Sequence, residues 1–201
     1  MNATNDPRTR IVKAAGDLLY AKSYGEVGVA AICEAAGVKK GSFYHFFPSK
    51  QDLTVEVLEH AWQAMKAELL DRAFRADRSP MERIERFARL AYEYQKDLAE
   101  RTGQVYGCPF GNMAAEQATQ DEQLRIKTQE IFARMQQALE ATLREALQRG
   151  DIAGIDPSAT AAAMYAYSEG VMLLAKTAND ADVIARLLPA MVRIRIPSES
   201  S

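Results

Sequence analysis

The most constraining feature of this sequence is a short apolar stripe that ends in a glycine and is followed at once by a second short helix. The stripe around Ile32 recurs at helical spacing, and Gly37 stands where a helix C-terminal cap is expected. The second helix must end before Pro48, because proline cannot continue a helix. Two short helices joined by a brief turn that contains glycine form a helix-turn-helix. The sequence therefore predicts helices at about residues 28–36 and 40–47.

The second helix of this pair combines aromatic side chains with small and basic ones. Its three phenylalanines are expected to face the core, whereas Tyr44 and His45 point outward. Gly41 and Ser42 are small enough for the backbone to approach DNA closely. This composition is unusual for a core helix and suits a helix that lies against phosphates. We therefore interpret it as a recognition helix.

The charge of the chain is distributed unevenly. The net charge is −2, but residues 1–50 carry seven basic and four acidic groups, or +3. Residues 51–201 carry the remaining 18 basic and 23 acidic groups, or −5. A basic end on an acidic body is expected when one small part of a protein meets DNA.

Composition and spacing exclude several classes of protein. No run approaches the roughly 18 apolar residues of a membrane helix, and the N-terminus lacks an apolar signal-peptide core, so we expect a cytoplasmic protein. Cys33 and Cys108 lie far apart, which makes a disulfide scaffold unexpected. His45 and His60 have no cysteine partner at metal-ligand spacing. Because no phosphate loop or nucleophile elbow is present either, we expect no cofactor and no enzyme.

The sequence predicts helices in the rest of the chain as well. Helix start signals stand at Ser79, where Pro80 and Glu82 follow, and at Asp156, which precedes a proline. No strand pattern is present, which predicts an all-α fold, and Pro197 and the serine-rich tail are expected to be disordered. The further helices are expected at about residues 7–23, 50–75, 80–101, 110–119, 124–150, 157–178 and 181–194.

The N-terminal part of the chain resembles the DNA-binding domain of the TetR/AcrR family of transcriptional regulators. The resemblance covers about residues 8–55. It implies a homodimer of nine-helix subunits, with a helix-turn-helix DNA-binding domain at 1–49 and an effector-binding and dimerisation domain at 50–196. The residues that carry it are Arg8, Ile11, Ala15, Leu18, Val29, Ile32, Ala36, Gly37, Val38 and the run Lys40-Gly41-Ser42-Phe43-Tyr44-His45-Phe46-Phe47-Pro48-Ser49-Lys50.

The resemblance also implies which residues contact DNA. Lys40, Gly41 and Ser42 correspond to readers of base edges in the major groove. The full set of expected contacts is Lys39, Lys40, Gly41, Ser42, Tyr44, His45 and Lys50. One departure affects the helix at 28–36, because Val27 and Gly28 replace the usual hydroxyl pair that caps this helix and touches phosphate.

The function implied is that of a repressor held on a palindromic double-stranded DNA operator and released by a small hydrophobic or electrophilic effector. Two alternatives belong to other classes. One is a ligand-binding protein of the same fold without operator binding. The other is a helical enzyme that uses Cys108 as nucleophile, although no base pairs with it in the sequence.

Cys108 stands within a turn of the start of a predicted helix, where the helix N-terminus would favour the thiolate. Its loop resembles a Gly-Cys motif in a TetR subgroup that includes NemR-type sensors of electrophiles. Two interpretations stay open: a sensing thiol, or a small buried hydrophobe. Residues in such helical stripes are more often plain core than pocket lining. The candidate effector residues are Trp62, Met65, Tyr92, Cys108, Phe110, Met113, Phe132, Met135 and Tyr165.

A dimer interface is predicted near the C-terminus. Ala162, Ala166 and Gly170 recur every four residues, and such a ridge of small side chains lets another helix approach closely. Leu187 and Met191 of the following helix are expected to complete the interface. The alternative is close packing within one subunit.

Overall fold

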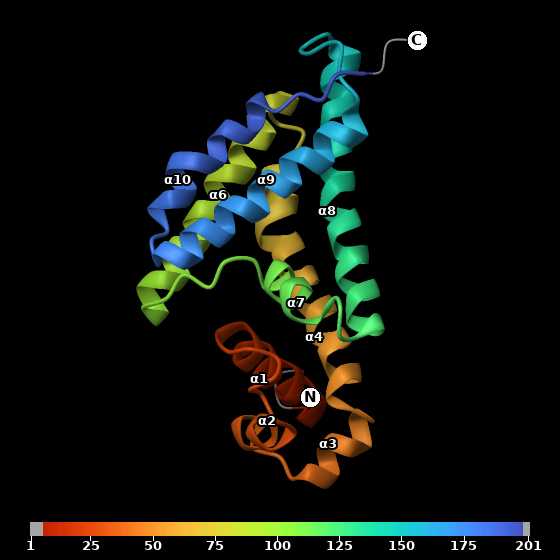
Figure 1. Ribbon diagram of the computed structural model, residues 1–201, viewed down its shortest axis with the longest axis vertical. Coiled ribbons are helices and arrows are strands. Elements are labelled where there is room, and N and C mark those ends of the chain that lie inside the picture. Colours follow the sequence, from red (N-terminus) through yellow and green to blue (C-terminus); the bar gives the residue numbers. More distant parts are fainter. Residues whose placement is uncertain (1–5, 199–201) are drawn as a thin grey trace. The chain divides into compact units, whose positions relative to one another are not determined.

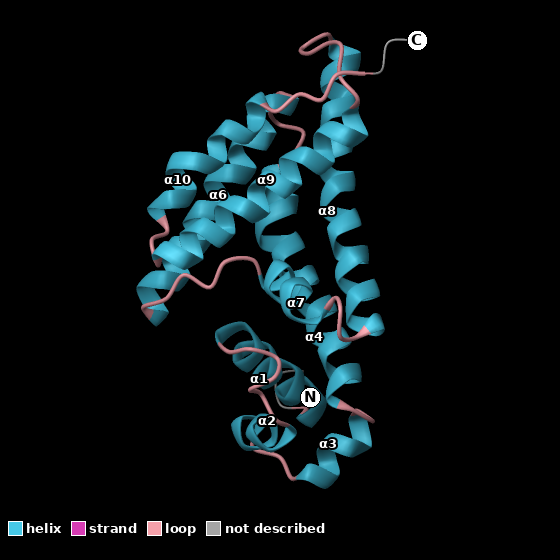
Figure 2. Cartoon of the chain, viewed as in Figure 1, coloured by secondary structure: helices cyan, strands magenta, loops and turns pink. Residues whose placement is uncertain are grey.

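The structure, a computed structural model, describes residues 6–198, and within that range the chain is almost entirely helical (Figures 1 and 2). The elements are α1 (Pro7–Ala21), α2 (Val29–Ala36), α3 (Lys40–Phe46), α4 (Lys50–Met65), η2 (Lys66–Leu70), α5 (Asp71–Ala73), α6 (Pro80–Thr102), α7 (Pro109–Gln117), α8 (Glu122–Arg149), α9 (Pro157–Ala178), α10 (Asp182–Leu187) and η3 (Leu188–Arg193). Segments α4, η2 and α5 run on without a break, as do α10 and η3. Counted in this way, the described residues form the nine helices that the sequence predicts.

The chain divides into two compact units. Unit 1 comprises Met1–Ala64 and Pro109–Glu130, and unit 2 comprises Met65–Cys108 and Ile131–Ser201. The chain therefore crosses from one unit to the other three times. The sequence predicts a different kind of boundary, between a DNA-binding domain that ends at residue 49 and an effector-binding domain that begins at residue 50. That functional boundary stays a prediction.

Unit 1 contains the predicted helix-turn-helix. Helix α1 begins at Pro7 behind an Asp6 N-cap, whose carboxylate accepts from the Thr9 amide at 3.3 Å. Helix α2 ends at Gly37, which adopts the left-handed conformation with φ of 63° that glycine tolerates best. The core of α1, α2, α3 and the start of α4 consists of Ile11, Val12, Ala15, Val27, Ile32, Cys33, Ala36, Phe43, Phe47, Leu53 and Val57.

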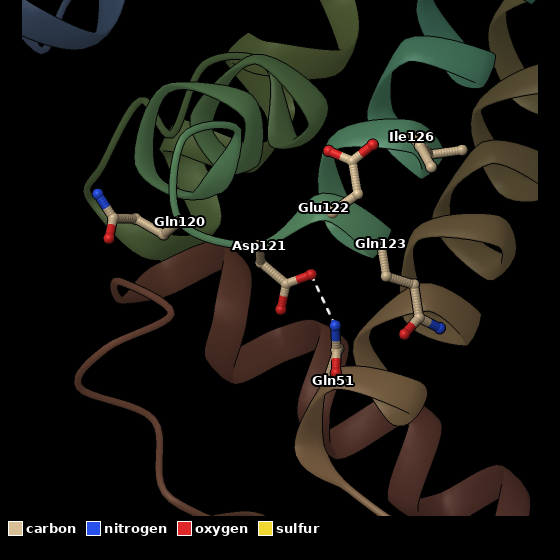
Figure 3. A pocket seen from close by; sticks show the side chains of 6 residues that line it. All are labelled: Gln51, Gln120, Asp121, Glu122, Gln123 and Ile126. Atoms are coloured by element: carbon tan, nitrogen blue, oxygen red, sulfur yellow. Dashed lines mark hydrogen bonds between the residues drawn. The ribbon is translucent and has the colours of Figure 1, made fainter.

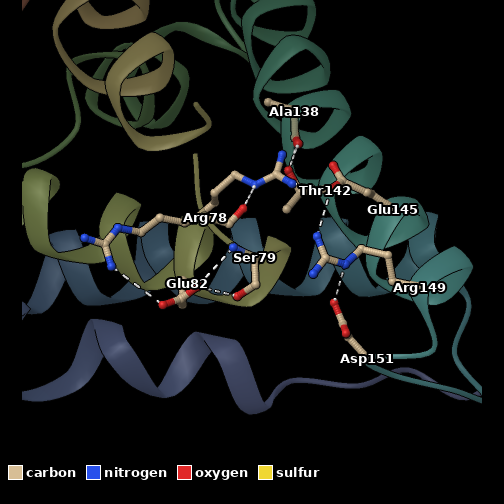
Figure 4. Close-up of polar contacts among 9 residues, drawn as sticks. Arg78, Ser79, Glu82, Ala138, Thr142, Glu145, Arg149 and Asp151 are labelled. Atoms are coloured by element: carbon tan, nitrogen blue, oxygen red, sulfur yellow. Dashed lines mark hydrogen bonds and ion pairs between the residues drawn. The ribbon is translucent and has the colours of Figure 1, made fainter. Parts of the chain in front are cut away.

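The helix start signals of unit 2 are confirmed. The Ser79 amide donates to the Glu82 carboxylate at 3.0 Å, and the two side chains form a capping box at the start of α6 (Figure 4). At α9 the Asp156 carboxylate accepts from the amides of Ser158 and Ala159, at 2.8 and 3.1 Å. These caps satisfy amide groups that have no partner inside their helices.

An ion pair joins α6 to α8 in unit 2. Arg83 is buried and pairs with Glu145, and its Nε donates to the Arg78 carbonyl oxygen at 3.1 Å. On the same stretch of α8, Arg149 pairs with Asp151 at 3.1 Å (Figure 4). A buried arginine requires such partners, because an unpaired buried charge is costly.

Three expectations need correction, two about helices and one about the C-terminal tail. The helix predicted at 50–75 contains a π turn at Lys66–Leu70, which brings Lys66 and Asp71 together at 2.7 Å although they are five residues apart. The helix predicted at 181–194 changes to 3₁₀ geometry at Leu188, because Pro189 has no amide hydrogen for the α-helical pattern. Pro197 is ordered and forms an isolated bridge with Ile155, whereas residues 199–201 of the tail lie outside the described range.

No helix in residues 6–198 is both long and apolar enough to cross a membrane.

Candidate nucleic-acid interface and effector site

Helix α3 has one buried and one exposed side. Phe43 is completely buried and Phe47 nearly so, and their rings lie 6.0 Å apart. Phe46 packs partly against the same core. Tyr44 projects the other way with 56% of its surface exposed, and His45 is also exposed. The phenylalanines therefore fix α3 to the core, and the outward side chains are left available to a partner.

Most of the predicted DNA contacts lie on this exposed side. Lys39, Lys40 and Gly41 are exposed, and Ser42 is half-buried. Lys39 is the N-cap of α3 and makes no capping bond through its side chain. The described turn and helix thus present two ammonium groups, a phenol and an imidazole beside a glycine without a side chain.

Lys50 lies differently from the other predicted contacts. Its ammonium donates to the carbonyl oxygens of Tyr24 and Val27, at 2.9 and 3.1 Å, and lies 3.8 Å from the centre of the Tyr24 ring. Burial lowers the pKa of this ammonium, and the nearby Glu116 carboxylate opposes the effect. The predicted phosphate contact of Lys50 is not supported by this placement, because its donors are directed at the loop between α1 and α2.

The start of α2 lacks a side-chain cap. Gly28 is the N-cap residue, and no side chain bonds to the first amides of the helix. The replacement of the usual hydroxyl pair by Val27 and Gly28 therefore leaves α2 without a side-chain cap, as the sequence predicts. Val27 itself is buried in the core of unit 1, so it contributes packing in place of a hydroxyl group.

The loop that leads to Cys108 is held by α6 and α9 within unit 2. Gly107 is buried with φ of 72°, and a Cβ at this position would lie 3.3 Å from the Met172 carbonyl oxygen. The Gln95 side chain donates to the Gly107 carbonyl at 2.9 Å. Asn179 accepts from the Val105 amide at 2.8 Å. Cys108, partly exposed, follows directly and precedes Pro109, the first residue of α7, as predicted.

A half-buried acid and a buried phenol accompany the Cys108 thiol. Glu169 is spaced four residues from Tyr165 along α9, so both lie on one face of that helix. Burial raises the pKa of the Glu169 carboxyl, and hydrogen bonding to Cys108 and Tyr165 partly opposes the rise. Burial also raises the pKa of Tyr165, whose hydroxyl is inaccessible to solvent. The sequence reasoning missed Glu169, because a single glutamate in an apolar helix looks like a solvent-exposed residue.

The other predicted effector residues are divided between the units. Trp62, Phe110 and Met113 are buried in unit 1. In unit 2 the rings of Phe132 and Tyr165 meet edge to face at 5.2 Å, and Met135 is buried. Met65 is half-buried, and Tyr92 bonds to Asp182 of α10 at 2.8 Å, so it packs on that helix. Among the described effector candidates, Cys108 and Tyr165 neighbour the Glu169 carboxyl, and Phe132 contacts the Tyr165 ring.

A hollow of about 500 Å³ lies elsewhere, in unit 1 (Figure 3). It is open to solvent, and the Gln51 amide donates to Asp121 at 2.7 Å on its wall. None of the predicted effector residues lines it. The lining residues are Gln51, Gln120, Asp121, Glu122, Gln123 and Ile126.

Helices α9 and α10 expose an apolar face. Ala166 and Gly170 are exposed, Ala162 is half-buried, and Leu187 of α10 is 37% exposed. Leu173 and Leu174, which the sequence reasoning did not include, are 62% and 56% exposed. Met191 is completely buried within the subunit, so the prediction that it belongs to this face is corrected.

Comparison with known proteins decides the family. A model of bacterial regulatory proteins of the tetR family matches residues 11–57, and a tetracyclin repressor-like C-terminal domain model matches residues 80–191, more than half of the chain. The chain belongs to the TetR family. It is a DNA-binding transcriptional regulator, and the family resemblance seen in the N-terminal sequence extends through the C-terminal domain.

Individual TetR-family relatives cover most of the chain. The transcriptional regulator AcuR of Cereibacter sphaeroides is 34% identical over 83% of this chain and 74% of its own. The repressor NemR of Escherichia coli is 28% identical over 68% of each chain. A crystal structure of a TetR regulatory protein from Rhodobacter sphaeroides superposes with a TM-score of 0.81 at 30% identity, covering 94% of this chain and 99% of that one. Members of this family bind DNA as dimers and also bind ligands.

Proposed function

We propose that this regulator is a repressor that binds a palindromic operator as a homodimer in the cytoplasm and dissociates when a small effector binds. The exposed side of α3 carries the proposal, since Lys39, Lys40, Tyr44 and His45 project from a helix anchored by Phe43. A two-fold dimer would place two such helices in successive major grooves, about 34–36 Å apart. Such a geometry requires a DNA site with matching symmetry.

Selection of duplexes from a random-sequence pool by the wild-type chain tests the proposal. We expect the recovered sequences to share an inverted repeat, and we expect Lys40→Ala and Tyr44→Ala to lose binding while melting as wild type does. Arg75→Ala is the matched control for the loss of one positive charge, because Arg75 is exposed and lies in unit 2. Recovery of no repeat would favour a ligand-binding protein of the same fold.

The dimer interface is proposed for the exposed face of α9 and α10. Leu173 and Leu174 continue the ridge of Ala166 and Gly170 along α9, and a subunit alone leaves them in water. Burying such leucines contributes about 1.5–3 kcal/mol each. Leu173→Glu is expected to convert the dimer to monomers, as measured by light scattering after gel filtration, whereas Glu93→Gln on α6 should leave the mass unchanged.

The effector is proposed to bind beside Cys108 in unit 2. The apolar rings of Phe132 and Tyr165 suit a small hydrophobic molecule, and the Cys108 thiol suits one that carries an electrophilic carbon. In the electrophilic case the sulfur forms the new bond and its proton is transferred to solvent or to the product. Treatment with a quinone, followed by intact mass and by the DNA-binding assay, distinguishes covalent from reversible effectors, with Cys108→Ser as control.

A further inference from the structure

One peptide group in unit 1 is held at both ends by charged side chains. The N–H of Gly25 donates to Oε1 of Glu116 at 2.9 Å, and the carbonyl oxygen of Tyr24, in the same peptide group, accepts from the Lys50 ammonium at 2.9 Å. The Tyr24 amide donates to Oε2 of Glu116 at 2.8 Å. Lys50 also reaches the Val27 carbonyl at 3.1 Å. These four bonds fix the loop that joins α1 to α2.

The side chains come from two elements that lie far apart in the sequence. Lys50 is the first residue of α4, whereas Glu116 lies near the end of α7. Both side chains are half-buried, and the Tyr24 ring covers the ammonium at 3.8 Å. Hydrogen bonds to charged groups are roughly twice as strong as neutral ones, and shielding from water reduces their screening. The loop is therefore held by long-range contacts in addition to its own turn, in which the Glu26 amide donates to the Ser23 carbonyl oxygen at 3.2 Å.

The loop needs such support because its own sequence supplies little. Glu26 bonds back to Ser23 through exposed contacts only, and the N-cap of α2 is Gly28, which contributes no side-chain bond. A helix start without a cap side chain loses a stabilising bond to its first amides. The bonds from Glu116 and Lys50 therefore add to the core packing of Ile32 and Phe43 in fixing where α2 begins and how α3 follows it.

We propose that Glu116 is a positioning residue for DNA binding, since its carboxylate and the Lys50 ammonium hold the loop that orients α2 and α3. The inference rests on the proposed function, because it concerns how well the DNA-reading helix is presented. Helix α7 starts at Pro109, directly after Cys108, so Glu116 also ties the helix-turn-helix to the segment that follows the proposed effector thiol. A displacement of α7 would release the amides of Tyr24 and Gly25.

The decisive comparison is between Glu116→Ala and Glu122→Ala. Both variants remove one negative charge from unit 1, and the exposed Glu122 bonds to Arg125 on the surface of α8. Simple electrostatics predicts that either change strengthens binding to polyanionic DNA. We expect Glu116→Ala instead to weaken binding to the duplex selected by the wild-type chain by about tenfold or more, whereas Glu122→Ala should bind as well as wild type or better. Glu116→Gln keeps one acceptor oxygen and should lie between them.

Amide exchange measured by NMR without DNA gives a second readout. In Glu116→Ala the amides of Tyr24 and Gly25 should exchange about tenfold faster or more, while those of the α8 interior keep their wild-type rates. Wild-type exchange at both amides, or wild-type DNA affinity in Glu116→Ala, overturns the assignment and leaves the proposed function intact. A wild-type chain that selects no duplex overturns the proposed function itself, and the role of Glu116 in DNA binding with it.

Discussion

The side-chain amide of Gln95 donates to the carbonyl oxygen of Gly107 at 2.9 Å, and both residues are buried. Gly107 has a positive φ that other residues rarely adopt, so the backbone sets the direction of its carbonyl group. Gln95 of α6 supplies the donor in that direction. This hydrogen bond fixes the backbone position of Gly107, the residue directly before Cys108. An amide in the interior of α6 thus positions a thiol that lies thirteen positions later in the sequence.

Replacing Gln95 with leucine should leave the Gly107 carbonyl buried without this donor. We expect a loss of about 1–3 kcal/mol in the free energy of unfolding, because a buried acceptor keeps its full desolvation cost. Urea unfolding followed by circular dichroism measures the loss. Gln104→Leu, at an exposed loop position, should stay within about 0.5 kcal/mol of wild type; an equal effect of the two changes would contradict the assigned role of Gln95.

Phe43 and Tyr44 are neighbours with opposite functions. Phe43→Ala should destabilise the fold by about 3–5 kcal/mol, since it empties the centre of the unit 1 core. Tyr44→Ala should change stability by less than about 0.5 kcal/mol, because the ring is mostly exposed, and it should affect DNA binding alone. Thermal unfolding compared with duplex binding separates the two residues. A strongly destabilised Tyr44→Ala would contradict the orientation of α3.

The two thiols should differ in reactivity. Cys33 is buried, and burial raises the pKa of its thiol, whereas Cys108 is partly exposed at the start of α7. Because the thiolate is the reactive form, N-ethylmaleimide should modify Cys108 well before Cys33 in the folded protein. Intact mass over time measures the order, and Cys108→Ser should remove the fast phase. A fast phase that persists in that variant would assign the reactive thiol to Cys33.

The stability contributed by Glu169 should fall as pH rises. Burial raises the pKa of this carboxyl above the ordinary value of 4.5, so the folded state holds the proton more tightly than the unfolded chain does. The associated stabilisation is complete below the unfolded pKa and is lost as pH increases through the folded pKa. Glu169→Gln should therefore gain stability relative to wild type as pH rises from about 4.5 into the alkaline range. A difference that stays constant across this range would contradict the shift; Glu85→Gln, at an exposed position, is the control.

Lys50 can be distinguished from a phosphate contact by salt dependence. Losing one phosphate contact lowers the slope of log K against log salt concentration by about one unit. Lys50→Met should weaken DNA binding with an unchanged slope, because the ammonium bonds to the carbonyls of Tyr24 and Val27. Lys40→Ala, which alters an exposed ammonium, is the comparison expected to change the slope. A slope reduced equally in both variants would restore Lys50 as a phosphate contact.

The arrangement of α1 to α3 could be predicted from the sequence because its signals are local. Gly37 ends α2 and Pro48 follows α3. The apolar positions around Ile32 and Phe43 mark the buried sides of these two helices. The caps at Ser79 and Asp156 are local as well, so the starts of α6 and α9 were predictable. Each of these features depends on residues within one or two turns of each other.

The contacts that the sequence did not reveal join distant segments. Glu116 reaches Tyr24 across 92 positions, and Glu169 meets Cys108 only after α9 has folded beside the loop. No periodicity marks a residue whose partner lies on another element. The family position of Lys50 predicts a phosphate contact, whereas its bonds to the carbonyl oxygens of Tyr24 and Val27 show where its ammonium is directed.

Unit 1 is built from two separate segments of the chain, and this affects the design of truncated and chimeric proteins. Unit 1 consists of Met1–Ala64 together with Pro109–Glu130, so a truncation after residue 64 omits the helix that supplies Glu116. A fragment cut there should show a poorly held loop between α1 and α2 even if its core forms. An exchange of DNA specificity between relatives should accordingly transplant both segments, keeping Tyr24, Lys50 and Glu116 from the same parent.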